Sequence, residues 1–127
     1  MKFDTIIIGG GLSGLISGIY LSQRGQRCVI ISSGQSALHF SSGSFDLLNN
    51  LPDGTSVQKP LDAISELVKQ APTHPYAKLG ETKFKELAQQ AEEFFKNAGI
   101  STQGDHEENH YRVTPMGTLK PTWLTHA

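Results

Sequence analysis

Near its N-terminus the chain reads Asp4-Thr5-Ile6-Ile7-Ile8-Gly9-Gly10-Gly11-Leu12-Ser13-Gly14. Residues 5–8 form a short β-branched run, which is typical of a strand buried in a parallel sheet. Three adjacent glycines interrupt this run. Apolar residues then recur at helical spacing from Leu12 to Tyr20, and Gly25 is placed to end the helix. The segment therefore predicts a strand that passes directly into a helix.

A second short apolar run, Arg27-Cys28-Val29-Ile30-Ile31, follows the predicted helix. Two strands that are joined by one helix are expected to pair in parallel through a right-handed crossover. Residues 4–31 thus predict a strand-helix-strand unit of the α/β class. The glycines at its first junction make the predicted unit Rossmann-like.

The glycines match the pattern G-x-G-x-x-G at the place where it carries meaning, between a strand and a helix. Amide groups in the first helical turn have no acceptor within the helix, and they point with the positive end of the helix dipole toward a bound anion. We therefore expect a phosphate of a nucleotide or flavin to be bound by Gly9, Gly10, Gly11, Leu12, Ser13 and Gly14. The alternative is that the glycines only end a strand, as they do in many proteins that bind nothing.

The end of the second predicted strand departs from the usual dinucleotide-binding pattern. An Asp or Glu normally stands there and receives the ribose hydroxyls of adenosine, whereas this chain has Ser32. A serine can donate or accept a hydrogen bond, but it lacks the charge-assisted, two-point contact of a carboxylate. The ligand is then either a dinucleotide held less tightly at its adenosine end or a mononucleotide such as FMN.

A polar loop follows, and its hydroxyl groups and glycines suit close approach to a flat polar ring. The expected contacts in this loop are Ser33, Ser42 and Gly43, in addition to Ser32. The same composition also marks ordinary connectors, and His39 without a paired carboxylate is read as a loop residue. No residue is assigned a catalytic role.

Two regions are predicted. Residues 1–45 form the cofactor-binding unit with its loop, and residues 46–127 form an insertion that ends in a hairpin. Helices are expected near 60–71 and 82–98, because apolar residues recur there at spacings of three and four. A doubly wound sheet needs more strands than the two found here. The chain is therefore predicted to be the N-terminal piece of a longer protein, truncated at its C-terminus.

Smaller features are also expected in the second region. A turn of helix is expected at Phe45 to Asn49, and Pro72 to Pro75 is expected to be a connector. The hairpin is expected to pair residues 111–114 with residues 118–120. The charged face of the helix at 82–98 is expected to lie in solvent; its residues are Lys83, Lys85, Glu92, Glu93 and Lys96.

Composition narrows the function classes. The 127 residues include 12 acidic and 11 basic side chains, so the net charge of -1 gives no field that favours nucleic acid. Thr5 to Leu21 is apolar, but its glycine cluster argues against a membrane span. Cys28 is the single cysteine, and His106 and His110 are read as part of an acidic loop, so no metal site is expected. A cytoplasmic location is the default expectation.

Three segments together resemble the B subunit of bacterial anaerobic glycerol-3-phosphate dehydrogenase. They are residues 3–15, residues 34–44, and residues 112–119 with Thr122-Trp123-Leu124. The glycine motif is shared by many flavoproteins, whereas the serine-rich block and Pro115-Met116-Gly117-Thr118 are much narrower signals. The likeness runs along the whole chain.

The resemblance implies a flavoprotein roughly three times this length, with FMN rather than FAD as its cofactor. It also implies two partners: a larger, FAD-containing catalytic subunit, and an iron-sulfur subunit that anchors the complex at the inner membrane. The complex would oxidise sn-glycerol 3-phosphate to dihydroxyacetone phosphate and pass electrons to quinone, with fumarate or nitrate as the final acceptor. This chain alone would be inactive. Two other functions remain open, an NAD-dependent dehydrogenase and an assembly protein without a cofactor.

Overall fold

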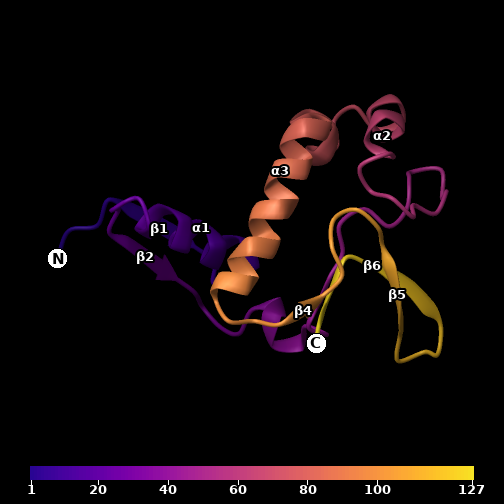
Figure 1. Ribbon diagram of the computed structural model, residues 1–127. Coiled ribbons are helices and arrows are strands. Elements are labelled where there is room, and N and C mark those ends of the chain that lie inside the picture. Colours follow the sequence, from indigo (N-terminus) through magenta and orange to yellow (C-terminus); the bar gives the residue numbers. More distant parts are fainter. The chain divides into compact units, whose positions relative to one another are not determined.

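The computed structural model describes residues 1–127, which divide into two compact units, Met1–Ser42 and Gly43–Ala127. The α/β class predicted from the sequence is confirmed (Figure 1). No helix combines the length and apolar character that crossing a membrane would require.

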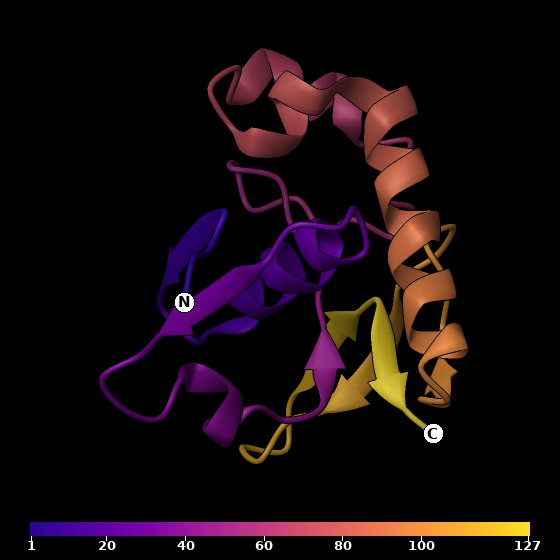
Figure 2. The ribbon, with the colours of Figure 1, turned by 90° about the vertical axis from the view of Figure 1, so that its left-hand side faces the viewer.

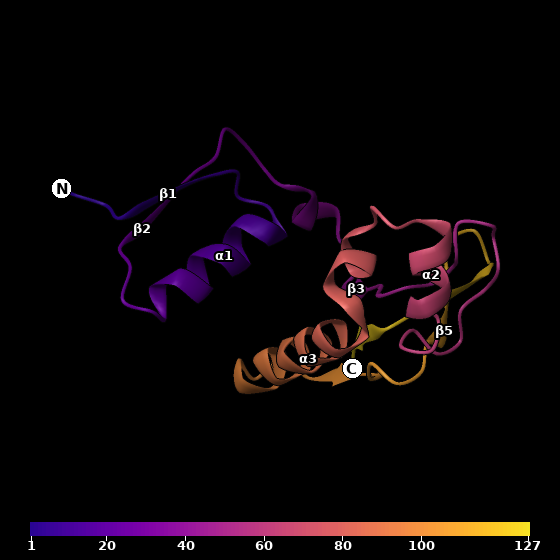
Figure 3. The ribbon, with the colours of Figure 1, turned by 90° about the horizontal axis from the view of Figure 1, so that it is seen from above.

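The first unit is a strand-helix-strand element. Strand β1 (Thr5–Ile8) and strand β2 (Cys28–Ile31) pair in parallel, with Ile6 opposite Val29 and Ile7 opposite Ile30. Helix α1 (Leu12–Ser22) connects the strands and lies along one side of them (Figure 3). The helix ends earlier than the sequence predicts, and the chain turns through Gly25, whose φ is 80°.

Gly18 lies where α1 packs closely against the two strands. It is the one buried residue of the helix, and a Cβ placed there would lie 3.3 Å from Ile30 Cδ1 and 3.4 Å from Ile7 Cδ1. The other face of the strand pair is open, since Ile6 and Ile8 are exposed. A short 3₁₀ helix, η1 (Ala37–Phe40), follows β2.

The second unit contains two small antiparallel sheets. Strand β7 (Leu124–His126) lies between β3 (Ser44–Phe45) and β4 (Thr102–Gln103), and it runs opposite to β3 (Figure 2). The second sheet is the hairpin of β5 (His110–Val113) and β6 (Leu119–Thr122). The predicted hairpin is therefore present.

The face of this hairpin that carries apolar side chains is turned to solvent. Tyr111, Val113 and Leu119 are all exposed, and so is Met116 at the turn. The polar face is held to the rest of the unit, because Arg112 bonds Ser44 and both Lys120 and Thr122 bond Asp46. The hairpin is thus anchored by hydrogen bonds rather than by a hydrophobic face.

Two helices complete the second unit and differ in their bounds from the prediction. Helix α2 (Ile64–Gln70) is shorter than the predicted segment at 60–71. Helix α3 (Pro75–Asn97) begins at Pro75, inside the expected connector, where the His74 side chain caps it by accepting from the Tyr76 amide. Gly80, with φ 73° and ψ 166°, breaks the helix just before the start predicted at residue 82.

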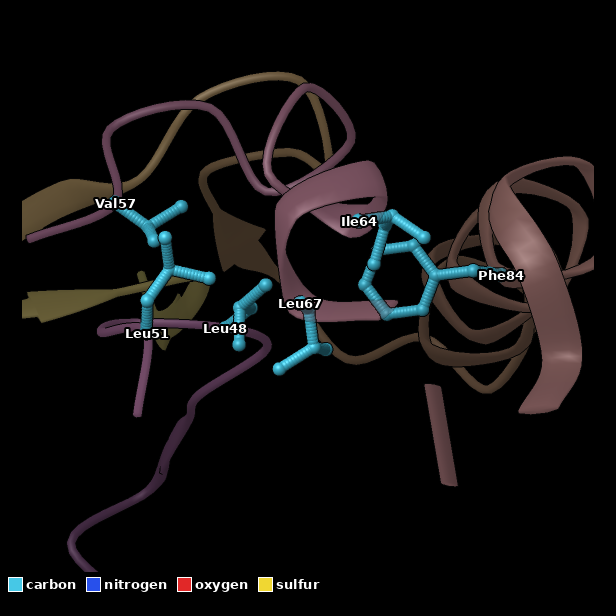
Figure 4. Packing of buried hydrophobic residues seen from close by; sticks show 6 residues of the cluster. All are labelled: Leu48, Leu51, Val57, Ile64, Leu67 and Phe84. Atoms are coloured by element: carbon cyan, nitrogen blue, oxygen red, sulfur yellow. The ribbon is translucent and has the colours of Figure 1, made fainter. Parts of the chain in front are cut away.

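The hydrophobic core of the second unit has two parts. In the first part, α2 packs against α3 and against the loop that precedes α2. Six buried side chains meet there (Figure 4): Leu48, Leu51, Val57, Ile64, Leu67 and Phe84. The second part joins Ala88 of α3 to Trp123 and Leu124. The helical turn predicted at Phe45 to Asn49 is wrong, because Phe45 belongs to β3 and pairs with Leu124.

Candidate functional site

The turn between β1 and α1 is closed by backbone contacts. The Gly9 amide donates to the Ile31 carbonyl at 2.8 Å, which continues the strand pairing by one residue. Gly9 has a φ of 110°, a left-handed conformation that side-chain-bearing residues rarely adopt. A Cβ at Gly14 would lie 2.1 Å from the Gly9 carbonyl oxygen. Gly9 shapes the turn, and Gly14 lets the helix start directly against it.

Backbone amides at this turn remain without acceptors in the protein. The amides of Gly10 and Gly11 donate to no other backbone or side-chain atom, and no side chain caps the N-terminus of α1. Amides in a first helical turn also lack acceptors within the helix. Space beside Gly11 is open, since nothing lies within 4 Å of a Cβ built there. The geometry therefore suits an anion such as a phosphate group.

Ser32 stands beside the turn, at the end of β2. Its Cβ and Oγ lie 3.2 Å from the position of a Cβ on Gly10, so the structure brings these two predicted residues together. The Ser32 hydroxyl donates to the Gly34 carbonyl at 3.0 Å. Ser33 follows in the same loop and is exposed.

The loop after Ser33 forms η1 before it reaches the remaining predicted contacts, Ser42 and Gly43. Ser36 accepts from the Leu38 amide at 3.3 Å and caps η1, in which His39 and the exposed Phe40 meet edge to face at 5.0 Å. Ser42 ends the first unit. Gly43 begins the second unit, where its carbonyl accepts from the His126 amide at 3.2 Å. A role for Ser42 and Gly43 beside the turn stays a prediction.

The first unit carries a single carboxylate, and it lies away from the glycine turn. Asp4 stands at the start of β1 and accepts two hydrogen bonds from the Arg27 guanidinium, each 3.1 Å long, and one from the Arg27 amide. These hydrogen bonds lower the pKa of Asp4. The glycine turn is at the opposite end of β1, so no acidic side chain of this unit competes with a bound anion there.

The second unit contains a polar cluster that the sequence pattern did not predict. Glu92 was expected in solvent, but its carboxylate accepts from Trp123 Nε1 at 2.8 Å and lies 3.1 Å from His106 Nδ1. Its side chain is only 23% exposed. The expectation failed because the partners come from residues 106 and 123, which helical spacing within α3 does not reveal. His110 is separate, with Nε2 at 3.3 Å from Thr125 Oγ1.

Comparisons with known proteins identify a family and several relatives of this chain. The chain matches the FAD binding domain family over residues 4–127. It is 50% identical to the B subunit of the anaerobic glycerol-3-phosphate dehydrogenase of Pectobacterium atrosepticum over 127 residues, and 55% identical to that of Yersinia enterocolitica over 128 aligned positions. The corresponding protein of Haemophilus ducreyi is 50% identical over 125 residues.

These relatives are much longer proteins. The alignments cover 98–100% of this chain but 29–30% of each of these three relatives. No solved structure matches the chain. The match over almost the whole chain, together with the open glycine turn at the start of α1, places it in a family of flavin-binding proteins. The chain belongs to the FAD binding domain family.

Proposed function

We propose that this chain forms the phosphate-binding part of a flavin site in the B subunit of an anaerobic glycerol-3-phosphate dehydrogenase. The observation that carries the proposal is the glycine turn, with acceptor-free amides at Gly10 and Gly11 and open space beside Gly11. The names of the relatives and the FAD binding domain family support it.

The residues of the turn fit a phosphate group. A side chain at Gly14 would strike the Gly9 carbonyl, and one at Gly11 would enter the space that an anion would occupy. The proposed contacts within residues 1–45 are Gly9, Gly10, Gly11, Leu12, Ser13, Gly14, Ser32, Ser33, Ser42 and Gly43. When bound, the flavin supplies the redox chemistry, and this chain holds its phosphate and orients it.

We further propose FMN as the flavin, although the family is named for FAD. Support comes from the lack of any Asp or Glu between Asp4 and Asp46, because this stretch then supplies no carboxylate at the C-terminal end of β2 for the ribose of an adenosine. The Asp46 carboxylate already accepts hydrogen bonds from Lys120 and Thr122 within the protein.

The role of the whole protein is proposed from the resemblance and from the relatives' names. It would relay electrons and would not itself oxidise substrate. It would work with an FAD-containing catalytic subunit and an iron-sulfur subunit in the oxidation of sn-glycerol 3-phosphate, peripheral to the inner membrane and on its cytoplasmic side. The electrons would pass to quinone.

A Gly11→Val variant tests the flavin site. Gly11 has an extended backbone, with φ -77° and ψ 179°, and nothing near its Cβ position, so valine should fold normally yet fill the anion's place. We expect the wild-type protein, produced at the length of its relatives, to be yellow and to bleach on reduction. We expect the variant to be colourless with an unchanged far-ultraviolet circular dichroism spectrum.

The matched control is Ser22→Val, which places the same side chain at the exposed far end of α1. This control should retain the flavin. A colourless wild-type protein, or a Gly11→Val variant with normal flavin content, would contradict the proposal.

A further inference from the structure

At the end of β2, where the ribose of a bound dinucleotide would lie, the side chain is the neutral hydroxyl of Ser32. Ser32 lies against Gly10, next to the amides that suit a phosphate. In dinucleotide-binding folds, the residue at this position receives both hydroxyls of the adenosine ribose. A carboxylate does so with two charged oxygens, whereas serine has only one neutral oxygen.

The hydroxyl of Ser32 already donates a hydrogen bond within the protein. Its hydrogen goes to the Gly34 carbonyl at 3.0 Å, so Oγ is left to act only as an acceptor. A ribose diol brings two O–H donors, and the single neutral oxygen of Ser32 offers them neither the two separate acceptor atoms nor the negative charge of a carboxylate. The ribose would therefore be bound less tightly here than by a carboxylate.

No other side chain of the first unit can replace the missing carboxylate. The stretch from Thr5 to Phe45 contains no Asp or Glu. Asp4 is at the opposite end of β1, where Arg27 holds it in a two-point ion pair. The first unit therefore has amides that suit a phosphate but no carboxylate beside them for the ribose of an adenosine.

We propose that Ser32 is a specificity-determining residue that makes this site nearly indifferent to the adenosine half of a flavin cofactor. This inference rests on the proposed flavin site and deepens it. The adenosine half of FAD carries a ribose diol, and at this end of the site the diol meets one neutral acceptor. FAD should therefore bind only slightly more tightly than FMN. A carboxylate at residue 32 would restore the discrimination.

The test measures the dissociation constants of FMN and FAD by isothermal titration calorimetry. It uses flavin-free protein produced at the length of its relatives. For the wild type we expect FAD to bind no more than about tenfold tighter than FMN, which corresponds to about 1.4 kcal/mol. A larger preference for FAD would overturn the inference and leave the flavin site itself standing. Wild-type protein that binds neither flavin would overturn the proposed function, and this inference with it.

Variants at residue 32 give a second measurement. Ser32→Glu should shift the ratio of the two dissociation constants toward FAD by about tenfold or more, since hydrogen bonds to a charged group are the stronger kind. Ser32→Gln has the same length without the charge, and Ser22→Glu adds the charge at the far end of α1; both should leave the ratio as in the wild type. Equal ratios for Ser32→Glu and Ser32→Gln would refute the role of the missing charge.

A variant without the hydroxyl keeps the test decisive if the charged variant does not fold. Ser32→Ala should change the ratio by no more than about threefold, because one hydrogen bond to a neutral oxygen contributes little net free energy. A larger loss of FAD affinity relative to FMN would show that Ser32 already anchors the ribose, and the inference would fall.

Discussion

Replacing Gly14 by alanine should destabilise the protein, although alanine favours a helix. Gly14 is the third residue of α1, and glycine inside a helix costs about 1 kcal/mol relative to alanine. Against this gain, the new Cβ would lie 2.1 Å from the Gly9 carbonyl oxygen and 3.3 Å from Ile7 Cγ2. The first distance is far shorter than a normal carbon-to-oxygen contact, and a backbone oxygen cannot rotate away.

The size of the effect follows from these two opposing contributions. Forcing an extra carbon into a tightly packed site costs about 1–3 kcal/mol, and a rigid backbone neighbour puts this site at the upper end. After the helix-propensity gain of about 1 kcal/mol, the free energy of unfolding should fall by about 2 kcal/mol. Gly18→Ala is the matched control in the same helix. Its Cβ would meet only the ends of the Ile7 and Ile30 side chains, at 3.3–3.4 Å, and these can move.

Urea unfolding of the flavin-free protein, followed by circular dichroism, measures both variants without a contribution from ligand binding. The midpoint for Gly14→Ala should fall clearly below that of the wild type, and the midpoint for Gly18→Ala should lie between the two or near the wild type. If Gly14→Ala were as stable as Gly18→Ala, the close contact between Gly9 and Gly14 would be wrong, and with it the geometry of the turn.

Two further predictions concern the second unit. Trp123→Phe keeps an aromatic ring but removes the Nε1 hydrogen that bonds Glu92. The free energy of unfolding, measured with urea at neutral pH, should therefore fall by about 1–2 kcal/mol. An unchanged midpoint would rule out a stabilising role for this hydrogen bond. Burial alone would raise the pKa of Asp46, but hydrogen bonds from Lys120 and Thr122 outweigh it and lower this pKa. A lowered pKa stabilises the folded state above the ordinary aspartate pKa of about 4, and this contribution is lost as the pH falls through the folded-state pKa. Asp46→Asn should therefore be less stable than the wild type at pH 7, and the difference should shrink below pH ~4; a difference independent of pH would contradict the ion pair.

The first unit could be predicted from the sequence because its determinants are local. Residues 5–8 and 28–31 are β-branched or apolar runs, and the glycines between them mark the turn. Each element is bounded by signals within a few residues of it. The predicted proximity of Ser32 to the glycine turn also followed, since parallel strands end at the same edge of a sheet.

Much of the second unit could not be predicted, because its strands depend on distant partners. Strands β3 and β4 are two residues long, and both pair with β7 near the end of the chain. No periodicity can be read from two residues, so Phe45 was expected in a helical turn instead. Glu92 was misplaced for a similar reason, since only the tertiary fold brings Trp123 to it.

The donors of the glycine turn are main-chain amides. This limits the conditions that can change the affinity of the turn for an anion. A peptide N–H does not titrate near neutral pH, has no rotamers to order and cannot be neutralised by acetylation, unlike the lysine that serves elsewhere. The hold on a phosphate at this junction should therefore depend on acidity only through the phosphate itself. Its donors are also positioned once the Gly9 amide joins Ile31, without further adjustment of side chains.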